Sequence, residues 1–106
     1  MPRFVRSSLL ALALVAAAGL SAAAAEIRID NFTFSPQTLT VAQGTTITWV
    51  NRDDTPHRLA GTANQFKSPV LDTDETFTWT AAEPGKVAYF CTMHPHMTGT
   101  IVVTAK

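Results

Sequence analysis

The feature that most constrains the fold is a regular alternation of apolar and polar residues in short segments. From Glu26 onward, segments rich in threonine, valine, isoleucine and aromatic residues are separated by glycine, proline, asparagine and aspartate. A two-residue period puts every second side chain on one face of a β-strand, and no stretch follows the 3.6-residue period of a helix. We therefore predict an all-β domain.

The alternation defines about seven short strands, which predict a small antiparallel sandwich or barrel. The predicted strands are residues 26–34, 38–42, 45–51, 57–60, 75–80, 86–91 and 99–105. The segment between the fourth and fifth strands is expected to be mostly loop, anchored on the core by Phe66, Val70 and Leu71. Trp49, Phe77 and Trp79 are expected to be core side chains without a cofactor role.

Residues 1–25 are organised like a secretory signal peptide. Two arginines precede a short apolar run, and small residues end at Ala25. The alternative is an uncleaved membrane anchor, but the apolar run is shorter than the ~20 residues that span a bilayer. We therefore expect cleavage after Ala25, export to the periplasm and no stable membrane insertion. The remaining residues, 26–106, are predicted to be the folded domain.

The charge balance gives no reason to expect a nucleic-acid partner. The chain has eight basic and eight acidic residues, and loss of the leader's arginines leaves a slight acidic excess without a basic cluster. No repeat or linker divides residues 26–106, so we expect one domain and a monomer. A domain of this size is near the lower limit of unaided stability, and a metal that binds only the native state would stabilise it.

One stretch near the C-terminus gathers side chains that bind soft and borderline metal ions. Cys91, His94 and Met97 are spaced three residues apart, and His57 can supply a second imidazole. Two imidazoles, a thiolate and a weak axial thioether are the ligands of a blue-copper site. The alternative is a buried, inert cysteine, as is common for a free thiol. An exported chain with one cysteine forms no internal disulfide, so a metal thiolate explains the residue better.

The sequence resembles the small type I copper proteins of the cupredoxin family. The matching elements are Trp49-Val50-Asn51-Arg52, Pro56-His57, and Cys91-Thr92 through His94-Pro95 to Met97. The resemblance implies a cupredoxin-like Greek-key β-sandwich and one mononuclear copper ion, with the ligands His57, Cys91, His94 and Met97. It also implies that Asn51 hydrogen-bonds toward Thr92 and ties together the two segments that carry the ligands.

Two residues of the ligand-bearing stretch depart from the family's pattern. Met93 replaces a common proline, and His96 replaces a usual aromatic residue. We expect His96 to be exposed, because the copper ligand set is complete without it. The alternative is that His96 competes with His94 or Met97 and makes the site more tetragonal. Met93, Pro95 and His96 would surround a partly exposed His94 as a small docking patch.

These features predict a periplasmic one-electron carrier that cycles between Cu(I) and Cu(II). Its partners would be redox proteins, and the resemblance implies a dehydrogenase donor and a c-type cytochrome acceptor. Two alternatives stay open. One is a periplasmic protein that buffers or delivers copper, and the other is a structural zinc site, although methionine is not a usual zinc ligand. We do not expect an enzyme, because a closed four-ligand site leaves no open position for a substrate.

Overall fold

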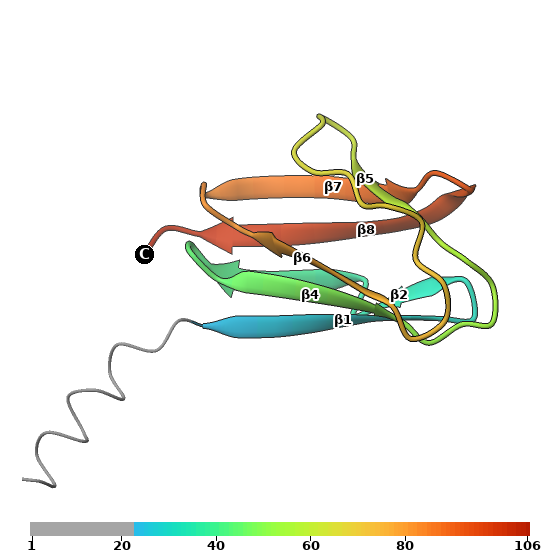
Figure 1. Cartoon of the computed structure of the whole chain (residues 1–106). Helices are drawn as coiled ribbons and strands as arrows, with labels where there is room; N and C mark the ends of the chain where they lie inside the picture. The colour runs from blue at the N-terminus through green and yellow to red at the C-terminus, as the bar shows by residue number, and fades with distance from the viewer. Residues whose placement is uncertain (1–22) are drawn as a thin grey trace, which may run out of the picture.

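The computed structural model describes residues 23–106, which form two β-sheets packed face to face (Figure 1). The predicted leader lies outside the described residues except for its last three, of which Ala24 and Ala25 open the first strand. In the part of the chain that the structure describes, no helix has the length and hydrophobicity needed to cross a membrane.

Eight strands follow one another along the chain: β1 (Ala24–Asp30), β2 (Thr33–Ser35), β3 (Thr38–Ala42), β4 (Thr46–Asn51), β5 (Leu59–Gly61), β6 (Thr76–Thr80), β7 (Gly85–Cys91) and β8 (His94–Thr104). The first sheet has the order β2-β1-β4-β6, and the second has the order β3-β8-β7-β5. The predicted all-β sandwich is confirmed. Both sheets are mixed, however, because β1 runs parallel to β4 and β3 runs parallel to β8.

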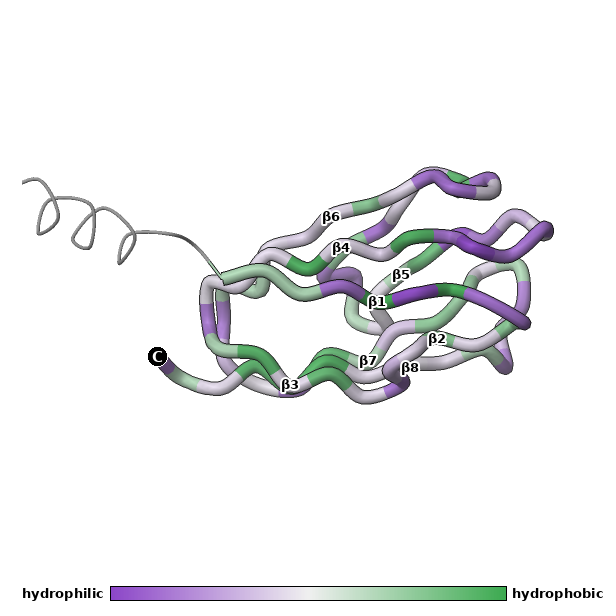
Figure 2. Tube along the Cα trace, turned by 90° about the horizontal axis from the view of Figure 1, so that it is seen from below, coloured by the Kyte–Doolittle hydropathy of each residue, from purple (hydrophilic) through white to green (hydrophobic). Residues whose placement is uncertain are grey.

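The core follows from the alternation. Hydrophobic and hydrophilic residues alternate along β1 (Figure 2), and its Ile27 and Ile29 are fully buried. Trp49 of β4 is also fully buried, whereas Phe77 and Trp79 of the edge strand β6 are partly buried and pack against the same core.

The loop anchors between β5 and β6 were predicted only in part. Phe66 and Leu71 are buried, but Val70 is 48 % exposed. The prediction for Val70 was wrong because hydrophobicity alone does not tell which of two adjacent apolar residues in a loop faces the core.

Residues 26–34 do not form one continuous strand. Asn31 and Phe32 have φ values of 49° and 58°, so the chain turns between β1 and β2, with Asp30 paired to Thr33. The type I′ turn, which is one of the two common two-residue hairpin turns, needs left-handed backbone at both positions. That conformation is unfavourable for a side chain as large as phenylalanine, and the alternating pattern therefore did not predict this turn.

The strand β8 begins at His94, well before the predicted start at Gly99. Only Thr92 and Met93 separate it from the end of β7. Cys91 pairs with His94 while Phe90 pairs with Thr98, so residues 95–97 have no partner on β7. The ligand-bearing segment is thus a hairpin with a bulge rather than a long free loop.

Candidate metal centre

The predicted nitrogen and sulfur ligands meet at one end of the sandwich. Cys91 ends β7 and His94 begins β8, so the hairpin fixes these two side chains relative to each other. His57 lies on the connection from β4 to β5. Its backbone N–H donates to the Leu71 carbonyl at 3.1 Å, and its carbonyl accepts from the Leu71 N–H at 2.7 Å. These two hydrogen bonds hold His57 against the β5–β6 connection.

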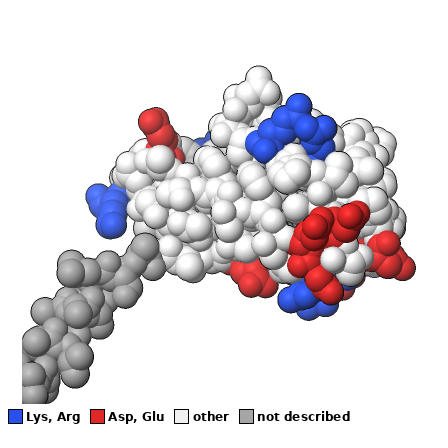
Figure 3. All heavy atoms as spheres, in the orientation of Figure 1, with Lys and Arg blue, Asp and Glu red and all other residues white. Residues whose placement is uncertain are grey.

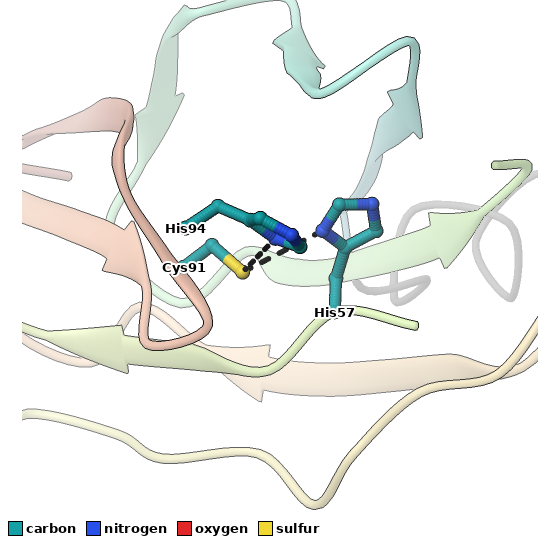
Figure 4. A group of neighbouring side chains, drawn as sticks. All are labelled: His57, Cys91 and His94. Atoms are coloured by element: carbon teal, nitrogen blue, oxygen red, sulfur yellow. Dashed lines mark hydrogen bonds between the residues drawn. The ribbon is translucent and has the colours of Figure 1, made fainter. Parts of the chain in front are cut away.

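Both imidazole rings present Nδ1 to the Cys91 thiol (Figure 4). Cys91 Sγ lies 3.5 Å from His57 Nδ1 and 3.6 Å from His94 Nδ1, and the ligand atoms of the three residues all lie within 4.8 Å of one another. His57 and Cys91 are fully buried, whereas His94 is partly exposed. His94 is therefore the member of the group that lies nearest to solvent.

The spacing of these atoms fits a shared metal ion. Bonds of about 2.0 Å to nitrogen and about 2.3 Å to sulfur place two ligand atoms of one ion about 3.5–3.8 Å apart. The two sulfur–nitrogen separations fall in that range. Zinc accepts the same three ligands, but a thioether is not among its usual ones. A thiolate, two imidazoles and a nearby methionine suit copper.

Met97, the fourth predicted ligand, lies in the part of β8 that has no partner on β7. Its side chain is buried and packs in the hydrophobic core. Together with His57, Cys91 and His94, Met97 makes up a candidate copper site. Its role as the weak axial ligand stays a prediction.

Sequence reasoning missed Asp53, whose carboxylate contacts the Nε2 side of the His57 ring, while Nδ1 faces Cys91. Asp53 Oδ2 lies 3.0 Å from His57 Nε2, and both side chains are buried. With Nε2 donating its proton to Asp53, Nδ1 keeps its lone pair toward Cys91, as a metal ligand requires. This hydrogen bond is the largest cause of a lowered Asp53 pKa. The available signal was an acidic residue four positions before a candidate ligand.

Phe32 is a second residue that sequence reasoning missed. Its ring makes edge-on contacts with the imidazoles of both His57 and His94. No motif marked it, because Phe32 comes from the β1–β2 turn, which the alternating pattern did not predict.

Asn51 does not make the contact that the resemblance implied. The expectation of a hydrogen bond toward Thr92 was wrong, because the side-chain amide of the buried Asn51 hydrogen-bonds to other residues. Its Nδ2 donates to the carbonyls of Thr55 at 3.0 Å and Leu71 at 2.9 Å, and its Oδ1 accepts from the N–H of Asp53 at 3.0 Å. The Thr92 N–H instead donates to the Arg58 carbonyl at 2.8 Å, which links the two ligand-bearing segments through backbone groups.

Met93 and His96 lie outside the ligand group. Met93, in the β7–β8 turn, is 45 % exposed. The expected exposure of His96 is confirmed. Within residues 23–106, the group of side chains that could hold a metal contains the other two histidines and Cys91, but not His96.

A two-sheet β-sandwich with a Cys-His-His-Met cluster at one end defines the cupredoxin class of copper proteins. The family model of the cupredoxin-like domain matches residues 5–103, and the chain belongs to this family. Among its relatives are amicyanins. The amicyanin of Paracoccus versutus is 33% identical over 94 residues, a match that covers 84% of this chain and 71% of the relative.

Solved structures show the same relationship. A purple cupredoxin from Nitrosopumilus maritimus matches with a TM-score of 0.72 and 32% identity, over 76% of this chain and 99% of that protein. A copper-containing nitrite reductase from Thermus scotoductus matches with a TM-score of 0.73 and 28% identity, over 80% of this chain. That match covers only 23% of the reductase chain, so the likeness extends to one part of the enzyme.

Proposed function

We propose that the protein is a one-electron carrier with a single type I copper ion bound by His57, Cys91, His94 and Met97. The observation that carries the proposal is the placement of two Nδ1 atoms at 3.5 and 3.6 Å from Cys91 Sγ in a chain of the cupredoxin family. The similarity to amicyanins supports it. The bound copper supplies the Cu(I)/Cu(II) couple, and the protein supplies the fixed ligands.

The ligands are held by backbone structure rather than by the metal alone. The β7–β8 pairing fixes Cys91 and His94, and hydrogen bonds to Leu71 and Asp53 fix His57. A preorganised site needs little rearrangement when the charge of the metal changes. This rigidity favours rapid gain and loss of one electron.

We propose His94 as the point where electrons enter and leave. Met93, Pro95 and His96 are exposed around it. In Figure 3 the atoms over the β7–β8 turn belong to neither acidic nor basic residues, while acidic residues gather over the β5–β6 connection. A small, uncharged surface suits brief encounters between redox proteins. The proposed partners are a dehydrogenase donor and a c-type cytochrome acceptor, in the periplasm to which the leader would direct the chain.

The optical spectrum of the Cu(II)-loaded protein tests the proposal. We expect an intense thiolate-to-copper band near ~600 nm. The matched control is Cys91→Ser, which removes the thiolate from the same buried position and should lack the band. A colourless Cu(II) protein, or a preference for zinc over copper, would overturn the proposal.

Copper delivery is a second candidate function, favoured by the exposed Met93 and His96 beside the site. The burial of Met97 and His57 counts against it, because a donor needs ligands that its acceptor can reach. Repeated cycles of reduction and oxidation in the presence of a Cu(I) chelator separate the two functions. A carrier keeps its copper through these cycles, whereas a donor loses it.

A further inference from the structure

Phe32 holds an unfavourable backbone conformation at the tip of the β1–β2 hairpin. Its φ is 58°, and that of Asn31 before it is 49°. Asparagine tolerates the left-handed region, but a phenylalanine there is an outlier. Such conformations persist where the surrounding structure holds them, and they cluster at functional sites.

The group that holds the hairpin tip is the carboxylate behind the metal centre. The Phe32 N–H donates to Asp53 Oδ2 at 3.1 Å, and His57 Nε2 lies 3.0 Å from the same oxygen. One oxygen atom therefore joins the tip of the hairpin to a buried imidazole of the candidate copper site.

The Phe32 ring lies against both imidazoles. Its centroid is 5.6 Å from that of His57 and 5.0 Å from that of His94, and the interplanar angles are 80° and 81°. The residue is also 46 % exposed. One side of the ring thus packs on the two imidazoles while another side faces solvent.

We propose that Phe32 is a positioning residue that closes the metal centre: its ring excludes water and small ligands from Cys91 and fixes the two imidazoles relative to the thiol. The proposal deepens the proposed copper function and rests on it for its biological meaning. The Phe32 ring would close the site in the metal-free protein as well, so its effect can be measured without copper.

Reaction of the thiol with a disulfide reagent measures this closure directly, because Cys91 is the only cysteine in the chain. In the metal-free protein, Phe32→Gly should raise the reaction rate about tenfold, as expected for the loss of two edge-to-face aromatic contacts. Glycine accepts the left-handed backbone, so the turn and its hydrogen bond to Asp53 are retained. In the copper-loaded protein, the same change should speed copper release to a chelator about tenfold.

Matched variants separate the ring from the turn. Asn31→Gly relaxes the same hairpin without touching the ring, and Phe32→Tyr keeps the ring, so both should react at the wild-type rate. Phe32→Asn, which also tolerates left-handed backbone, is a second ringless variant, and urea unfolding checks that each variant is folded.

An unchanged thiol reaction rate in both ringless variants, or an equal increase in Asn31→Gly, would overturn the role of Phe32. Failure of the protein to bind copper would instead overturn the proposed function. The thiol measurement would still decide the role of Phe32, so the two failures can be told apart.

Discussion

At the scale of single residues, one carboxylate organises the site. Asp53 accepts hydrogen bonds from the His57 ring and from the backbone N–H groups of Phe32 and Asp54. The His57 contact is the largest cause that lowers the pKa of Asp53 from its usual 3.8, and the backbone bonds add to it against the opposing effect of burial. A carboxylate with a lowered pKa stabilises the fold above its unfolded pKa, and that stability is lost as the pH falls through the folded pKa.

Asp53→Asn should therefore change the pH dependence of folding. At neutral pH it should lower the free energy of unfolding of the metal-free protein by roughly 1–3 kcal/mol, because it removes hydrogen bonds to a charged group. As the pH falls below 3.8, the free energy of unfolding should decrease less in the variant than in the wild type. Urea titrations across the acid range measure both effects. Asp54→Asn, at the exposed neighbouring position, is the control, and its stability should decline with falling pH as in the wild type. Identical pH profiles of stability for the Asp53 variant and the wild type would contradict the stabilising role of the Asp53 carboxylate.

His96→Ala should leave the absorption and paramagnetic-resonance spectra of the Cu(II) protein unchanged. The reason is that His96 is exposed and lies outside the group formed by His57, Cys91 and His94. His94→Ala, which removes a group member, serves as the control and should alter both spectra. A spectral change in His96→Ala would favour the alternative in which His96 competes for the metal.

The sequence predicted part of this site and missed the rest for a physical reason. Cys91, His94 and His57 could be named from residue type and spacing, and the structure brings them together. Asp53 and Phe32 could not, because their contacts depend on the path of two turns. Strand periodicity says nothing about the path of a turn.

At the scale of secondary-structure elements, the paired strands β7 and β8 contribute residues to both the hydrophobic core and the candidate metal site. Tyr89 of β7 is opposite Gly99 of β8, and the tyrosine is almost fully buried. Burial is the main cause that raises the pKa of Tyr89 to about 12, against a smaller opposing effect of Trp49. A Cβ atom at Gly99 would overlap the phenol end of the Tyr89 ring, so this position has room only for glycine.

Gly99→Ala should destabilise the protein by roughly 1–3 kcal/mol, because the added methyl group overpacks a closed contact. Thermal and urea unfolding of the metal-free protein measure the effect. Combining it with Tyr89→Phe should recover part of the loss, since the hydroxyl oxygen is one of the overlapping atoms and has no hydrogen-bond partner among residues 23–106. Wild-type stability in Gly99→Ala would show that the strands separate easily at this point.

Alternation predicted the strands of the core well but their boundaries and directions less well. Periodicity identifies which face of a strand is buried, and Ile27 and Trp49 are buried as expected. It does not identify the neighbour of a strand or the direction in which that neighbour runs. The parallel pairing of β1 with β4 and of β3 with β8 was therefore not predicted.

At the scale of the whole molecule, the uncharged surface around His94 is the proposed contact with redox partners. Met93→Glu should slow electron transfer to a c-type cytochrome several-fold at low salt while copper stays bound, because a charge at the edge of an interface mainly changes the association rate. Stopped-flow kinetics measure the rate. Val70→Glu places the same charge at another exposed apolar residue and should have no effect. Equal rates for the Met93 variant and the wild type would exclude this surface as the contact.

The position of β8 sets an order of events for the newly made chain. β8 is the last strand along the sequence, yet it lies between β3 and β7 in its sheet. β3 can therefore pair only after β8, which is distant in sequence, is available, and pairings so distant in sequence form slowly. His94 is the first residue of that same strand. A chain in which β8 has not yet joined its sheet consequently lacks His94 at the proposed copper site, so we expect copper binding to follow this late pairing.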